Sequence, residues 1–342
     1  GGPGGAEEKG EPEEVAALVR LATVGEVGML DCAWSAEQRC DGASLLATAC
    51  SDERARLFSV DTGIVGADGA QAPTPTQVAS VACEGAGVCM SVAWGSLAAG
   101  TSNRLVLSST AGMLHVIDMA SGSMTVISSW NAHSDSCWTA AFDEVHPHVL
   151  YSGGDDAAFK VWDLREANND MSALSASCNR KSHGAGVCCV SPNRGCTNAP
   201  AAAIVATGSY DESARLWDTR MMQAPLLAVG CGGGVWRLKW HHEHPTLMLA
   251  ACMHAGFTSL RVPATFADVK GSLGASGASA MEIDTRYTEH GTGDALGYGA
   301  DWAPWQTRWG YRNKQCKRPL LAATCSFYDC ALHLWSCPVP HV

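Results

Sequence analysis

Apolar and polar positions along this chain form short stretches that predict strands. In residues 151–165 and 206–220, a strand of small residues leads into an aspartate turn, and a second strand with alternating apolar positions follows. In both stretches the second strand leads into a Trp-Asp pair, at Trp162 and Trp217. Alternation with a period of two is the pattern of a half-buried strand. The sequence shows no convincing amphipathic helix of core length, so we expect an all-β fold.

The two stretches are copies of one unit, and further copies follow the same spacing. Asp156 precedes Trp162 by six positions, and Asp211 precedes Trp217 by six. This spacing yields six repeats, at about residues 31–60, 89–118, 133–165, 183–220, 232–262 and 290–336. A single unit cannot bury its own apolar face, so the copies must stack. The repetition predicts a β-propeller of the WD40 kind.

Length and composition limit the other possibilities. The 342 residues suffice for one large all-β domain, which we place at residues 15–342. Residues 1–14 are rich in Gly, Pro and Glu, and we expect them to be disordered. The net charge of −11 argues against direct nucleic-acid binding and suits a basic partner.

Cysteine usage and apolar runs bear on the compartment. The 16 cysteines lack any Cys-x-x-Cys spacing, and many stand inside apolar strands. Without a signal peptide, this usage predicts reduced thiols in a cytoplasmic protein. No apolar run approaches the length of a membrane span, so no membrane association is expected.

Histidine and aspartate recur together in three repeats, for which we predict a structural role. The groups are His133 with Asp156 and Trp162, His183 with Asp211 and Trp217, and His290 with Asp329 and Trp335. Buried polar groups need hydrogen-bond partners, and a histidine–aspartate pair inside a blade supplies them. We do not interpret these pairs as catalytic dyads. Residues 241–244 resemble metal ligands but stand in a predicted turn, so no metal site is expected.

The fifth repeat departs from this pattern at two places. It has Gly232, Gly233 and Gly234 where three repeats have histidine, and His254 where four others have aspartate. Successive glycine amides could stabilise an oxyanion, and His254 could act as a base near neutral pH. Simple divergence is the alternative, because the second repeat also lost its aspartate, to Ala111, without gaining a chemical group.

Aromatic residues recur at another set of equivalent positions. Trp138, Trp236 and Tyr298 each stand four residues before the end of a predicted inner strand, near the rim of the channel. Arg237 and Asp301 stand close to them in the sequence. Aromatic faces bind quaternary ammonium groups by cation–π attraction, at about 0.5–2 kcal/mol each. Ordinary core packing is the alternative explanation.

Several longer strings carry a family resemblance. They include residues 232–241, 249–257, 298–302 and 323–329. Together they resemble the diphthine methylesterases of the diphthamide pathway, which are WD40-repeat proteins. The resemblance runs from about residue 20 to the end of the chain. That family has an additional repeat before the first one seen here, which implies a seven-bladed ring whose first blade this sequence lacks.

The resemblance implies a reaction and a partner. The family removes the methyl ester from methylated diphthine on elongation factor 2, giving diphthine and methanol. The substrate carries a trimethylammonium group, which Trp138, Trp236 and Tyr298 could hold beside Arg237. No cofactor is expected, and we expect a monomer whose partner is the modified elongation factor 2.

The reaction suggests roles for residues of the fifth and sixth repeats. We expect His254 to activate water, or Cys252 to act as the nucleophile in a less favoured variant. The amides of residues 232–234 would stabilise the oxyanion, and Asp301 would orient the base or pair with substrate charge.

Two readings without catalysis compete with the hydrolase. Most WD40 propellers are interaction scaffolds, in which His254 and the aromatic residues would grip a partner peptide. A third reading is a domain that recognises trimethyl-lysine tails, which would bind such peptides without cleaving an ester.

Overall fold

The computed structural model describes residues 27–38, 43–61, 75–119, 123–166, 175–193, 204–263, 280–288, 290, 296–302, 320–326, 328–329 and 331–337. Over these residues the regular structure is strand, apart from one 3-10 turn at Leu164–Glu166. The all-β prediction is therefore confirmed. No helix in these ranges is long and apolar enough to cross a bilayer. The predicted disordered segment 1–14 lies outside them.

Three antiparallel sheets are formed by the first half of the chain, with four strands each in chain order. The first contains β1 (Met29–Gln38), β2 (Ala43–Cys50), β3 (Arg54–Asp61) and β4 (Thr76–Ala82). The second contains β5 (Cys89–Trp94), β6 (Arg104–Ser109), β7 (Met113–Asp118) and β8 (Thr125–Asn131). The third contains β9 (Cys137–Phe142), β10 (Val149–Gly154), β11 (Phe159–Asp163) and β12 (Ser175–Asn179).

Three further sheets follow, and the last has three strands among the described residues. The fourth contains β13 (Val187–Pro192), β14 (Ile204–Ser209), β15 (Ser213–Asp218) and β16 (Leu227–Gly230). The fifth contains β17 (Arg237–Trp240), β18 (Leu247–Ala251), β19 (Phe257–Arg261) and β20 (Glu282–Tyr287). The sixth contains β21 (Gly299–Trp302), β22 (Leu320–Ser326) and β23 (Ala331–Cys337).

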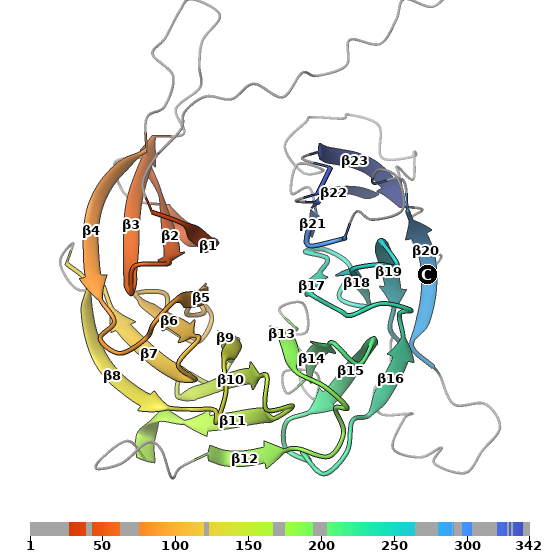
Figure 1. The fold of residues 1–342 in the computed structure, drawn as a ribbon, viewed down its shortest axis with the longest axis horizontal. Coiled ribbons are helices and arrows are strands. Elements are labelled where there is room, and N and C mark those ends of the chain that lie inside the picture. Colours follow the sequence, from red (N-terminus) through yellow and green to blue (C-terminus); the bar gives the residue numbers. More distant parts are fainter. Residues whose placement is uncertain are drawn as a thin grey trace, which may run out of the picture.

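The six sheets are the blades of a β-propeller, as the repeats predicted. Figure 1 shows them set around a central opening, with β1, β5, β9, β13, β17 and β21 innermost. Each inner strand packs on the inner strand of the next blade, from β1 on β5 to β17 on β21. The main apolar clusters lie between consecutive blades, so stacking buries the apolar faces of the repeats.

Blade one and blade six stand apart in Figure 1, so the described blades form an open ring. The exposure of the inner-strand tryptophans agrees with an open ring. Trp94, Trp240 and Trp302 are buried, and their indole N–H groups donate to carbonyls of the preceding inner strand at 2.8–3.0 Å. The equivalent Trp34 is 54 % exposed. Leu332 and Leu334 on β23 are also exposed, so both ends of the row of blades present apolar side chains.

The predicted hydrogen-bond network forms in blades three and six. In blade three, His133 binds Asp156 through Nδ1 and Ser152 through Nε2, each at 2.8 Å. Trp162 completes this network by donating its indole N–H to Ser152 at 2.8 Å. In blade six, His290 binds Asp329 and Thr324, and Trp335 donates to the same threonine. These histidines hold blades together, as expected.

In blade four the predicted pairing of His183 with Asp211 is wrong. His183 binds Thr207 at 3.0 Å, and Trp217 donates to the same hydroxyl. The carboxylate of Asp211 binds Arg215 at 2.8 Å instead and accepts from a loop amide. An arginine four residues away supplies a bidentate partner for the aspartate that the histidine cannot match.

Candidate functional site

The turn that carries His254 joins β18 to β19 and differs from the equivalent turns. In blades one, three and four, the residue after the turn aspartate has a positive φ. Here the positive φ values fall on Met253 (41°) and Gly256 (74°), on either side of His254. Two local backbone hydrogen bonds close the turn. Ala255 N donates to the carbonyl of Cys252, and Gly256 N donates to the carbonyl of Met253.

This turn lies between the glycine run and the start of blade six. A Cβ at Gly233 would lie 2.1 Å from the carbonyl oxygen of Cys252, so only glycine allows this approach. On the other side, Met253 and Gly297 exchange two backbone hydrogen bonds, and Gly297 directly precedes Tyr298. The backbone therefore brings together three predicted features: the glycine run, the His254 turn and Tyr298.

His254 and the glycine amides are not committed to structural bonds among the described residues. The His254 side chain is exposed, whereas His133 and His290 are buried and bonded through both ring nitrogens. The backbone N–H groups of residues 232–234 donate to no acceptor within the same set. The turn that carries this exposed imidazole packs against the glycine run, whose amides have no acceptor among the described residues.

The predicted aromatic residues are also brought together. The ring centroids of Trp138 and Trp236 are 5.4 Å apart, and those of Trp236 and Tyr298 are 5.4 Å apart, both in edge-to-face geometry. Two further rings extend the group. Tyr210 lies 6.1 Å from Trp138 and 5.9 Å from Trp236, and Tyr328 lies 6.3 Å from Tyr298. We call these five residues the aromatic arc.

Sequence reasoning missed Tyr210 and Tyr328, although a signal was present. Each directly precedes the turn aspartate of its repeat, at Asp211 and Asp329. That position lies at the end of the second strand of the blade, on the same face of the propeller as the start of the inner strands.

Arg237 lies over the ring of Trp236. Its Cζ is 5.4 Å from the ring centroid, and its Nη1 donates to the carbonyl of Trp236 at 3.1 Å. Its Nη2 lies 4.0 Å from Asp31 of β1, on the other side of the channel. The guanidinium therefore occupies one face of Trp236, and a substrate cation must find its aromatic faces elsewhere in the arc.

Asp301 is not brought to His254. Its carboxylate lies 3.7 Å from the ammonium of Lys239 and accepts a hydrogen bond from the amide of Trp302. The described structure gives it no contact with the imidazole of His254. Its predicted role in orienting the base has no geometric support in this arrangement.

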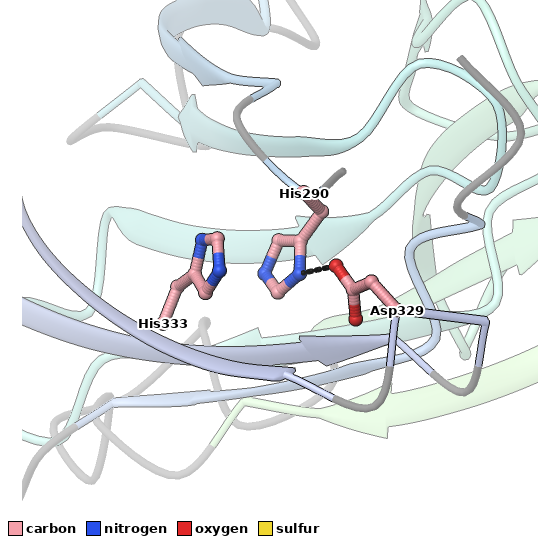
Figure 2. Close-up of side chains that lie close together, drawn as sticks. All are labelled: His290, Asp329 and His333. Atoms are coloured by element: carbon pink, nitrogen blue, oxygen red, sulfur yellow. Dashed lines mark hydrogen bonds and ion pairs between the residues drawn. The ribbon is translucent and has the colours of Figure 1, made fainter. Parts of the chain in front are cut away.

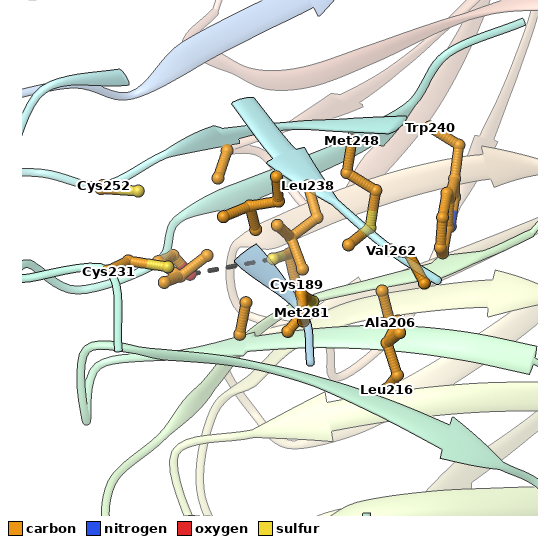
Figure 3. Close-up of a cluster of buried hydrophobic side chains, with 14 of the residues drawn as sticks. Cys189, Ala206, Leu216, Cys231, Leu238, Trp240, Met248, Cys252, Val262 and Met281 are labelled. Atoms are coloured by element: carbon orange, nitrogen blue, oxygen red, sulfur yellow. Dashed lines mark hydrogen bonds between the residues drawn. The ribbon is translucent and has the colours of Figure 1, made fainter. Parts of the chain in front are cut away.

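Cys252 lies in the apolar core between blades four and five, with its thiol close to that of Cys231 (Figure 3). The Cys231 thiol and burial together raise the pKa of the Cys252 thiol far above its usual range. A buried, protonated thiol is a poor nucleophile. The geometry therefore favours the variant in which His254 activates water.

One group of side chains resembles a metal site by composition. His290, Asp329 and His333 place one ligand atom each within 4.8 Å of one another (Figure 2). Both ring nitrogens of His290 are already bonded, and His333 accepts or donates a 2.8 Å bond with Tyr287. The two imidazoles stack at 3.9 Å. We assign this group to the packing of blade six.

Comparisons with known proteins agree with the WD40 fold and with the family resemblance. Residues 124–163 and 176–218 match the WD domain, G-beta repeat family. Human diphthine methyltransferase is 35 % identical over 234 residues, which cover 66 % of this chain and 46 % of that protein. The Schizosaccharomyces pombe diphthine methyltransferase is 30 % identical over 237 residues, covering 69 % and 61 %. This chain is a WD40-repeat homologue of the diphthine methyltransferases.

Two other matches are a second diphthine methyltransferase and a solved structure with the same fold. Mouse diphthine methyltransferase is 36 % identical over 204 residues, covering 58 % of this chain and 38 % of that protein. A chain in the crystal structure of the mitotic checkpoint complex has a TM-score of 0.63 at 17 % identity, covering 93 % of this chain and 78 % of its own length, and it shares the fold alone. The homologue spans about half the length of the diphthine methyltransferases it matches.

Proposed function

We propose that this chain hydrolyses the methyl ester of methylated diphthine on elongation factor 2, giving diphthine and methanol. One observation carries the proposal: in a homologue of the diphthine methyltransferases, the His254 turn is held by the glycine run on one side and by the Tyr298 segment on the other. The free cysteines among the described residues fit a reducing compartment, so we propose a cytoplasmic setting.

The chemistry of the substrate suits this juxtaposition. The quaternary nitrogen is attached to the carbon next to the ester carbonyl, so a group that holds the cation also places the carbonyl. Tyr298, which directly follows the segment bonded to the His254 turn, and the neighbouring ring of Tyr328 would hold the trimethylammonium group. The carbonyl would then lie beside the turn and the free glycine amides.

The proposed reaction is a water attack with balanced proton transfer. The imidazole of His254 takes a proton from water while the oxygen attacks the carbonyl carbon. The amides of residues 232–234 stabilise the resulting oxyanion. The intermediate collapses, the C–O bond to the methoxy group breaks, and the imidazolium returns the proton so that methanol leaves.

The test measures both mass and product. Purified chain is incubated with elongation factor 2 that carries methylated diphthine. We expect a loss of about 14 mass units per site together with release of methanol. A methyl transfer, which the name diphthine methyltransferase suggests for the relatives, would instead require a methyl donor and release no methanol. Binding without any mass change would support the scaffold.

The variant that probes the site is His254→Ala. Loss of a general base lowers kcat by at least about a hundredfold. His242→Ala is the matched control, because His242 is also exposed and stands in the turn at the opposite end of β18. Turnover by His254→Ala at the rate of this control would show that the imidazole has no part in the reaction.

A further inference from the structure

The aromatic arc is longer than one quaternary ammonium group requires. It runs from Trp138 in blade three to Tyr328 in blade six, and a trimethylammonium group can touch only two or three ring faces at once. Under the proposed function, Tyr298 and Tyr328 hold this cation beside the His254 turn, and Arg237 covers one face of Trp236. The other end, at Trp138 and Tyr210, adjoins the glycine run at Gly234 but is not needed to hold this cation.

Two glycines make room for Tyr210 at the far end. Gly186 stands where the repeats of blades three and five have tryptophan. A Cβ there would lie 3.4 Å from the ring of Tyr210 and 2.5 Å from the carboxylate of Asp155. On the other side, a Cβ at Gly234 would also lie 3.4 Å from the ring. The ring and the carboxylate thus share the space that two absent side chains leave.

The carboxylate of Asp155 is exposed and has no hydrogen bond or ion pair with the residues that the structure describes. Its neighbour Asp156 is fully engaged, with His133 at 2.8 Å and with Arg180 at 3.5 Å. Next to Asp155, the rings of Tyr210 and Trp138 meet edge to face, with their planes at 75°. A negative charge beside two half-buried aromatic rings is chemistry that recognises a cationic side chain.

We propose that Trp138, Tyr210 and Asp155 form a second cation subsite, which binds a lysine or arginine side chain of the protein substrate near the modified residue. This proposal rests on the proposed function. The net charge of −11 favours a basic segment of the partner. The subsite would make the enzyme prefer an ester carried by a protein loop over the same ester in a small molecule.

The experiment compares two substrates of the full chain. One is elongation factor 2 with methylated diphthine, and the other is the methyl ester of glycine betaine, which has the same quaternary nitrogen next to an ester carbonyl. The variant is Asp155→Asn, which keeps the size of an exposed side chain. The control is Glu243→Gln, an exposed acid in the turn at the opposite end of β18.

We expect Asp155→Asn to raise KM for the protein substrate. The ratio of kcat/KM for the protein to kcat/KM for the small ester then falls about two- to fivefold, the range of a lost ion pair at an exposed carboxylate. Glu243→Gln should keep the ratio of the wild-type chain. An unchanged ratio in Asp155→Asn would overturn the subsite. An equal loss on both substrates would also overturn it, because the carboxylate would then serve the trimethylammonium group.

If the wild-type chain cleaves neither ester, the proposed function fails. The subsite is then tested by a binding measurement. Titration calorimetry with elongation factor 2 that lacks the modification supplies this measurement. Weaker binding by Asp155→Asn than by Glu243→Gln supports the subsite. Equal affinities of the two variants, or no binding by the wild-type chain, overturn the subsite.

Discussion

Trp34 offers the sharpest test of the open ring, because its equivalents in the other blades are covered. A tryptophan side chain buries about 200 Å² when fully covered. Trp94 is 9 % exposed and so buries about 180 Å², worth about 4.5 kcal/mol at ~25 cal/mol per Å². Trp34 is 54 % exposed and buries about 90 Å², worth about 2 kcal/mol. Trp94→Ala should therefore destabilise the fold by about 2 kcal/mol more than Trp34→Ala.

Cavity formation points in the same direction. Removing Trp94 leaves a void between blades one and two and deprives the carbonyl of Ala33 of its 2.8 Å hydrogen bond. Removing Trp34 leaves no enclosed void. The assay is urea unfolding followed by far-UV circular dichroism, with Trp240→Ala as a second buried reference at 8 % exposure. Equal costs for Trp34→Ala and Trp94→Ala would refute the open ring, since another element would then cover this face.

Two further predictions concern the site and its neighbouring blade. Gly233→Ala should displace the His254 turn, because the added Cβ would lie 2.1 Å from the carbonyl of Cys252, and hydrolysis should fall with little change in circular dichroism; full turnover would contradict this reading of the turn. Burial and the nearby Arg215 lower the pKa of His183 to about 4. As the pH falls, the His183 imidazole is therefore protonated in the unfolded chain before it is protonated in the folded chain. Roughly 3 kcal/mol of stability that is present above pH 6.5 should be lost as the pH falls toward 4. The measurement is unfolding free energy against pH, where His183→Gln should flatten the slope; an unaltered slope would assign it to other groups.

The spacing of the repeats was enough to predict the blades, because strand length and turn geometry fix the distance between the turn and the third strand. The same spacing placed Trp138, Trp236 and Tyr298 at equivalent positions, and the radial arrangement then brings their rings together. Spacing alone does not predict which of several hydrogen-bond or ion-pair partners a side chain takes. The pairing of Asp301 with Lys239 depends on how two neighbouring blades meet.

The failure in blade four shows such a competition within one repeat. Asp211 has Arg215 four residues later, and Asp52 in blade one has Arg56 at the same spacing and binds it at 2.6–2.8 Å. In blade three the equivalent residue is Lys160, whose ammonium donates to the carbonyl of Ala132 and leaves Asp156 to the histidine. The sequence carried this signal, because only an arginine offers the aspartate a planar bidentate partner.

Blade five shows why the imidazole of His254 is available. Its residues at the positions of Thr207 and Trp217 are Ala250 and Leu260, both fully buried in the apolar core. Because both replacements are apolar, the loss of the network leaves no unpaired polar group at these two positions.

Blade two also replaced these network positions with apolar residues, Leu107 and Ile117, yet it has Ala111 at the turn. Divergence alone accounts for blade two. In blade five the same loss comes with an exposed histidine, a changed turn and a glycine run that only this turn requires. These coordinated changes support the proposed site over divergence at single positions.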